Sequence, residues 1–124
     1  AQAVPHAGWP NRMTDVQNLT YRVTLADTTV VHLGDADTKD FHFSPHAEYW
    51  SERDIHMAFP PYWYLFSKNG QQVLKRLNPS DVVGVHVPES VPANSAERPE
   101  QYRGPDLFTT PGETRVISID QVAD

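Results

Sequence analysis

Residues 28–37 read Thr-Thr-Val-Val-His-Leu-Gly-Asp-Ala-Asp, and the rest of the chain is best interpreted around this stretch. Its β-branched beginning, residues 28–31, predicts a buried strand. Gly34 ends this strand, and the carboxylates of Asp35 and Asp37 follow directly. Ligands of α/β proteins gather at the carboxyl ends of strands, so Asp35 stands where chemistry is usually done. A strand followed by a polar turn is the alternative interpretation, because Gly-Asp is also common in turns.

Composition limits the class of protein. The 124 residues carry a formal charge of −6 without a basic cluster, which argues against nucleic acid as a partner. A hydrophobic content of 39% indicates a folded chain, and the length suits one domain. No cysteine is present, so a metal would need histidine and carboxylate ligands, which suit zinc, manganese or iron. No apolar run approaches the roughly 20 residues of a membrane span. We therefore expect a soluble protein with no membrane partner and favour the cytoplasm, although no pattern identifies the compartment.

Apolar alternation and helical periodicity predict an α/β fold, with a mixed sheet of about five strands and one or two helices. The strands are expected at 19–25, 28–33, 55–59, 82–87 and 114–119, and the helix at 71–77. Ala26-Asp27 joins the first two strands into an antiparallel hairpin. The strand–helix–strand succession from 55 to 87 makes its two strands parallel. We expect a single domain, 1–124, with a proline-rich irregular segment at 88–112.

One apolar core is expected where the predicted helix packs on the sheet. Val73, Leu74 and Leu77 share one helical face, whereas Lys75 and Arg76 point outward. The residues that we expect to be largely buried are Val30, Val31, Ile55, Val73, Leu74, Leu77, Val83 and Val85.

Aromatic and histidine side chains accompany the predicted strands. Trp50 lies in a polar irregular segment, 36–53, and Tyr62 and Trp63 follow a strand end. These three aromatic residues could wall a substrate pocket or pack in the core, and the sequence leaves both interpretations open. We interpret His42 and His46 as solvated and His56 as structural.

Four short motifs, taken in their order and spacing, resemble the metallo-β-lactamase fold, and most closely its metal-dependent hydrolases. They are Pro5-His6, His32-Leu33-Gly34-Asp35, Asp54-Ile-His-Met-Ala-Phe-Pro-Pro and Val85-His86-Val87-Pro88. The hallmark of that family, His-x-His-x-Asp-His, normally lies in the first half of the domain and is absent from this sequence. The chain therefore resembles the second, C-terminal half of an αββα sandwich.

The resemblance implies a site for two metal ions, zinc in the first place, with manganese or iron as alternatives. It implies that His6 ligates one metal, that His86 ligates the other, and that Asp35 is the catalytic carboxylate bridging both. His32 and Asp37 would orient the ligands through hydrogen bonds. Metal-bound water has a pKa near about 7 and is a nucleophile at neutral pH. We expect His6, Asp35 and His86 to converge at one edge of the sheet.

Two functions are consistent with these residues. The first is part of a metal-dependent hydrolase that attacks a small-molecule substrate with metal-bound hydroxide. The alternative is a non-catalytic binding or self-associating half-domain that keeps the fold without a complete metal site. Three ligands shared by two metals leave each ion short of the three protein ligands that catalytic zinc normally takes. We therefore expect the isolated chain to be inactive, and to form a homo-oligomer or pair with a complementary chain carrying the missing ligands.

Overall fold

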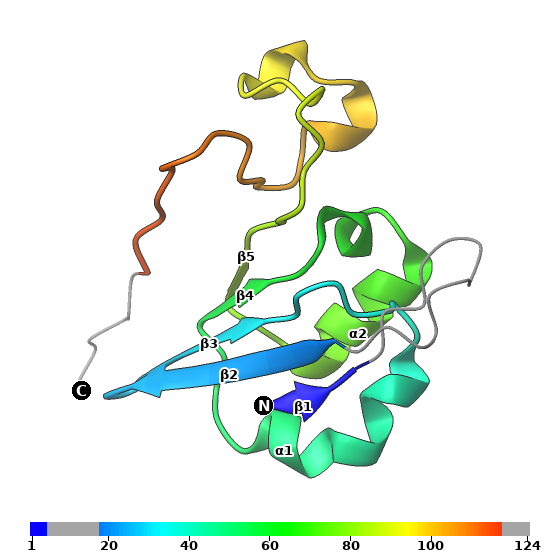
Figure 1. Ribbon diagram of the computed structural model, residues 1–124, viewed down its shortest axis with the longest axis vertical. Coiled ribbons are helices and arrows are strands. Elements are labelled where there is room, and N and C mark those ends of the chain that lie inside the picture. Colours follow the sequence, from blue (N-terminus) through cyan, green and yellow to red (C-terminus); the bar gives the residue numbers. More distant parts are fainter. Residues whose placement is uncertain (5–17, 118–124) are drawn as a thin grey trace.

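A five-stranded mixed sheet forms the body of the protein, which is α/β as predicted (Figure 1). The computed structural model describes residues 1–4 and 18–117. The strands lie in the order β1-β2-β3-β4-β5, with bounds Gln2–Ala3, Leu19–Leu25, Thr28–His32, Met57–Phe59 and Asp81–Val82. Two α-helices, α1 (Ala47–Ser51) and α2 (Lys68–Leu77), accompany them in the described residues. No helix in this part of the chain combines the length and the apolar composition needed to cross a membrane.

Strands β2 and β3 form the predicted antiparallel hairpin. Their pairing ends at Leu25 opposite Thr28, which leaves Ala26 and Asp27 as a two-residue turn. Ala26 adopts a φ of 53°, in the left-handed region used by the hairpin turns that match the twist of the strands. The hairpin prediction is therefore confirmed, including its connection.

Strands β4 and β5 are parallel and are connected through α2, as predicted, and β3 is parallel to β4 as well. Helix α2 begins earlier than predicted because Ser67 caps it, its Oγ accepting the N–H of Gly70 at 3.0 Å. The Asn69-Gly70 pair, expected to precede the helix, thus lies in its first turn. Asn78 ends the helix in the left-handed conformation, with a φ of 51°.

The predicted strand 82–87 is shorter than expected. Strand β5 ends at Val82, and beyond it Gly84 and Val85 form isolated bridges to neighbouring segments. The N–H of Gly84 donates to Asp106 at 2.9 Å, and its carbonyl accepts from Phe108 at 3.0 Å. A Cβ at Gly84 would lie 2.7 Å from a Leu107 methyl carbon, so a side chain there would displace Leu107. The sheet thus continues past β5 as single bridges.

The segment 36–53, predicted to be irregular, contains three short helical elements. They are the 3-10 helices η1 (Asp40–His42) and η2 (Ser44–His46), followed by α1. Phe43 and Trp50 from this segment are 0% and 2% exposed and belong to the hydrophobic core. Trp50 is therefore a core residue that holds the segment on the sheet, rather than part of a pocket wall.

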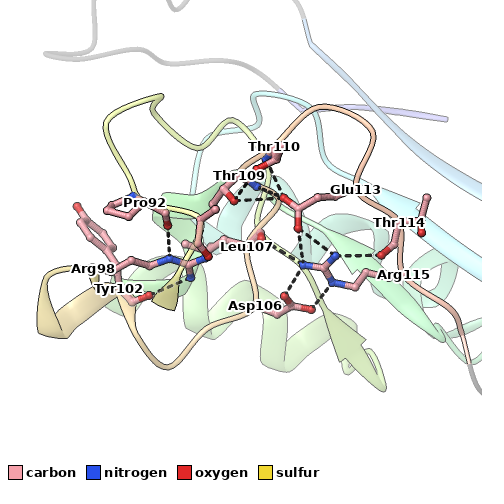
Figure 2. Close-up of polar contacts among 11 residues, drawn as sticks. Pro92, Arg98, Tyr102, Asp106, Leu107, Thr109, Thr110, Glu113, Thr114 and Arg115 are labelled. Carbon is pink, nitrogen blue, oxygen red and sulfur yellow. Dashed lines mark hydrogen bonds and ion pairs between the residues drawn. The ribbon is translucent and has the colours of Figure 1, made fainter. Parts of the chain in front are cut away.

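The proline-rich segment beyond β5 is irregular, as predicted, apart from the 3-10 helices η4 (Ser95–Glu97) and η5 (Glu100–Tyr102). Arg98 organises it from within (Figure 2). Its buried guanidinium donates to the carbonyls of Pro92 at 2.7 Å and Ala93 at 2.9 Å. Buried backbone carbonyls need a hydrogen-bond partner. Arg98 supplies one to these two carbonyls, which belong to no strand or helix.

The strand predicted at 114–119 is not formed by residues 114–117, and the remainder lies outside the described residues. Arg115 folds this part of the chain back on itself instead (Figure 2). Its guanidinium forms a bidentate pair with Asp106, at 2.9 and 2.8 Å, and lies 4.8 Å from the ring centre of Phe108. Glu113 accepts the N–H groups of two threonines at 2.7 Å, which closes a turn in place of strand pairing.

The hydrophobic core lies between the helices and one face of the sheet. Five of the residues predicted to be buried are less than 5% exposed, namely Val31, Ile55, Val73, Leu77 and Val83. Three others are only half-buried, namely Val30, Leu74 and Val85. Val30 is less buried than Val31 because neighbouring residues of a strand point to opposite faces, and only one face is covered by the helices.

The other face of β2 is apolar and open. Arg22 points toward α1, since it donates to the carbonyl of Tyr49 at 2.6 Å, so the alternate residues of β2 point away from the helices. These alternate residues are all apolar and exposed, and we call them the open face: Leu19 48%, Tyr21 49%, Val23 55% and Leu25 80%. In β3, Val30 and His32 are paired opposite Val23 and Tyr21 and continue this face.

We predict that Leu77→Ala lowers the free energy of unfolding by about 2–5 kcal/mol, because it leaves a cavity between α2 and the sheet. Leu77 is 4% exposed in the core cluster. The exposed Gln72→Ala in the same helix is the control and should change stability by less than about 0.5 kcal/mol. Urea denaturation followed by tryptophan fluorescence measures both, and equal values for the two variants would mean that the packing of α2 is misassigned.

Candidate functional site

Asp35 and His86 meet at the carboxyl edge of the sheet. Asp35 follows β3 directly, and His86 follows the bridge that pairs Val85 with Pro61, just beyond β4. Because β3, β4 and β5 are parallel, their carboxyl ends share one edge. The Nε2 of His86 lies 3.0 Å from the Oδ1 of Asp35, and both side chains are a little under half exposed. The predicted convergence of these two residues is confirmed, whereas His6 lies outside the described residues.

The turn that presents Asp35 depends on Asn18, which the sequence analysis did not single out. The Oδ1 of Asn18 accepts the N–H of Asp35 at 2.9 Å, and its Nδ2 donates to the carbonyl of Leu33 at 3.1 Å. Between them Gly34 has a φ of 60°, and a Cβ there would lie 2.5 Å from the Asn18 Oδ1. The site therefore requires glycine at 34 for its conformation and for space.

His86 also has an uncommon backbone conformation. Its φ is 60°, in the left-handed region that a non-glycine residue rarely occupies. Two hydrogen bonds hold the chain just before His86. The N–H of Val85 donates to the carbonyl of Pro60 at 2.9 Å, and the N–H of Tyr62 donates to the carbonyl of Val85 at 2.7 Å. Conformations of this kind persist where the surrounding structure imposes them, and they cluster at functional sites.

His32 lies beside the pair, at the last position of β3. Its Nδ1 accepts the N–H of Gly34 at 3.0 Å, and its ring lies 6.1 Å from that of Phe59. Burial lowers the pKa of His32, and nearby His86 lowers it further, while Asp35 acts in the opposite direction. The bond to Gly34 ties the His32 ring to the turn that presents Asp35.

Asp37 belongs to a second polar cluster. Its Oδ2 lies 3.0 Å from the Nε2 of His42, and both side chains are 15% exposed. The hydroxyl of buried Tyr64 donates to the carbonyls of Asp37 at 2.6 Å and Ala36 at 3.0 Å. Burial raises the pKa of the Tyr64 hydroxyl, and the carboxylate of Asp37 adds to this effect. His42 is thus an enclosed partner of Asp37, which corrects its interpretation as a solvated histidine.

The two other aromatic residues proposed as a pocket wall lie at different distances from the site. The ring of Trp63 stacks on His86, with centroids 6.3 Å apart and an interplanar angle of 30°. Tyr62 instead joins an aromatic cluster with Phe66 and Tyr102, which attaches η5 to the segment between β4 and α2. Of the three aromatic residues proposed as a pocket wall, Trp63 is therefore the one that lies beside the site.

Of the two remaining histidines, His56 is structural and His46 is exposed, as predicted. The Nδ1 of His56 accepts the N–H of Thr29 at 3.1 Å, which fixes the ring between β3 and the start of β4. His46 ends η2 and its side chain is solvent-exposed.

The donor atoms of Asp35 and His86 suit zinc, which binds imidazole nitrogen and carboxylate oxygen. In residues 1–4 and 18–117, no three or more histidine, aspartate or glutamate side chains are arranged to hold a metal ion. The two side chains therefore fit a metal in the type of their donor atoms, and the described residues bring these two together.

Comparison of the chain with protein-family models, with curated proteins and with solved structures found no match.

We predict that Asn18→Ala lowers the free energy of unfolding by about 1–3 kcal/mol, because the N–H of Asp35 and the carbonyl of Leu33 lose their partners. Asn69→Ala, at an exposed position in the first turn of α2, is the matched control and should stay within about 0.5 kcal/mol of the parent. Thermal and urea unfolding compare the two, and an Asn18→Ala protein of parental stability would show that the turn does not need these bonds.

Proposed function

We propose that the chain is part of a metal-dependent hydrolase, the C-terminal half of a metallo-β-lactamase-like domain. The observation that carries this proposal is the contact of Asp35 with His86 at 3.0 Å. The resemblance in sequence required these residues to meet, although they are far apart in the chain and belong to separate motifs. Their meeting point, at the carboxyl ends of parallel strands, is where α/β proteins bind their ligands.

Each residue has a specific role in this proposal. Asp35, through its carboxylate oxygens, and His86, through Nε2, would hold the metal. His6 would be a further ligand, and its position lies outside the described residues. Metal ions of this kind supply a hydroxide nucleophile at neutral pH. The atoms now in contact, Nε2 and Oδ1, are the donor atoms that a metal uses, so binding an ion replaces their mutual contact.

The missing ligands come, in this proposal, from a complementary chain or half-domain that packs on the open face. Leu19, Tyr21, Val23 and Leu25 form an apolar surface of the kind that soluble monomers rarely expose as large patches. His32 connects the open face with the site, because it is paired opposite Tyr21 of that face. A second sheet packed on this face would lie about 10 Å away and would reach the edge that carries Asp35.

The open face also favours a second candidate, a non-catalytic half-domain that associates with itself. Two copies can cover each other's open face in an isologous contact, because the same surface serves on both sides. This alternative needs no metal, and it leaves the contact between Asp35 and His86 as an ordinary polar interaction.

We predict that the isolated chain binds zinc weakly and that Asp35→Asn and His86→Asn each weaken binding by at least about tenfold. Asparagine is chosen at 86 because it tolerates the left-handed φ of 60°. His46→Gln, at an exposed position, is the control and should bind like the parent. Isothermal titration with zinc measures all four proteins, with ester and lactone hydrolysis followed in parallel. A monomer that binds two zinc ions tightly and hydrolyses these substrates would contradict the incomplete-site proposal.

We also predict that the isolated chain self-associates through the open face and that Val23→Lys shifts it toward monomer, because a charge there opposes burial. Sedimentation measures the effect across a concentration series. Thr24→Lys, one position along on the opposite side of β2, is the control and should keep the parental association. If Val23→Lys leaves both the association and the zinc affinity unchanged, the open face is not the contact surface.

A further inference from the structure

The hydrogen bond between Gly34 and His32 determines where the proton of the His32 ring lies. The backbone N–H of Gly34 donates to Nδ1 at 3.0 Å, and a backbone N–H can only donate. Nδ1 must therefore present a lone pair, and the proton of the neutral ring is on Nε2. The backbone turn that positions Asp35 thus also selects the tautomer of His32.

The bond from Gly34 requires an uncharged His32 ring. Charging it would break this bond, because both nitrogens of an imidazolium are donors. Phe59, with its ring centre 6.1 Å from that of the imidazole, is an apolar neighbour. A neutral imidazole with a proton on Nε2 therefore stands at the end of β3, bonded to the turn that presents Asp35.

We propose that His32 is a neutral hydrogen-bond donor of this site, which binds an oxygen of the substrate through Nε2–H and does not ligate the metal. This inference rests on the proposed hydrolase function and assigns His32 a different role from orienting the ligands. A substrate with a carbonyl oxygen, such as an ester or a lactone, matches such a donor. Donors placed at a carbonyl oxygen also stabilise the negative charge that develops there during acyl transfer.

The two roles of His32 exclude each other. To ligate a metal, Nε2 needs a lone pair, and the ring proton must then move to Nδ1. There it would face the N–H of Gly34, which would lose its acceptor. The tautomer of His32 therefore distinguishes a substrate donor from a metal ligand, and it can be read without any activity.

Nitrogen-15 NMR of the histidine side chains tests this in the full chain. We expect His32 in the Nε2–H form. On addition of zinc, the signals of His86 should change while His32 keeps the same tautomer. A His32 ring with its proton on Nδ1, before or after zinc, would overturn the inference. A zinc titration that leaves His86 unaffected contradicts the proposed function instead, so the two failures are distinguishable.

Two variants separate the nitrogens of His32. Asparagine places its amide near the position of Nδ1 and keeps the acceptor for Gly34, whereas glutamine places its amide near Nε2 and keeps the donor. With γ-butyrolactone as the probe, titrated by NMR, we expect His32→Asn to weaken binding by about fivefold, the loss of one neutral hydrogen bond. His32→Gln should stay within about twofold of the parent. Equal affinities for the parent and both variants would overturn the role of the Nε2 donor.

Discussion

The parallel pairing of β3, β4 and β5 is the constraint on which the rest of the structure depends. It fixes the direction of three strands, so that the segments after them emerge at one edge of the sheet. Asp35 and His86 belong to two of these segments, and their contact at 3.0 Å is a consequence of the pairing. The antiparallel hairpin and α2 serve the same arrangement, because the hairpin brings β3 into the sheet and the helix returns the chain for β5.

The parts of this fold that could be predicted from sequence are those with a long periodic signal. Alternation over 19–25 and the helical face of Val73 and Leu77 indicated their elements correctly, and strand direction then placed Asp35 near His86. Helix α1 was missed because Ala47–Ser51 is too short to show a helical period. The true start of α2 depends on a single capping hydroxyl, Ser67, ahead of the first apolar residue.

The polar contacts of the site could not be predicted, because they join residues that are distant in sequence and share no spacing rule. Asn18 binds the turn after β3 through both ends of its amide, and Tyr64 reaches the carbonyl of Asp37. The strand expected at 114–119 is absent from residues 114–117 for a related reason. Arg115 and Glu113 form local hydrogen bonds that compete with strand pairing, and no periodic pattern reveals such bonds.

The side chains of β2 are arranged in the opposite way to those of an ordinary surface strand, with polar residues inward and apolar residues outward. Thr20 is fully buried and Arg22 faces α1, while leucine, tyrosine and valine face the solvent. A surface of this kind links folding to mass action. Whatever binds β2 on its apolar side binds the native chain and not the unfolded one, and it therefore raises the free energy of unfolding with the logarithm of its own concentration. Wherever the association proposed for this surface takes place, the melting temperature of the protein therefore depends on the concentration of the chain or of its partner.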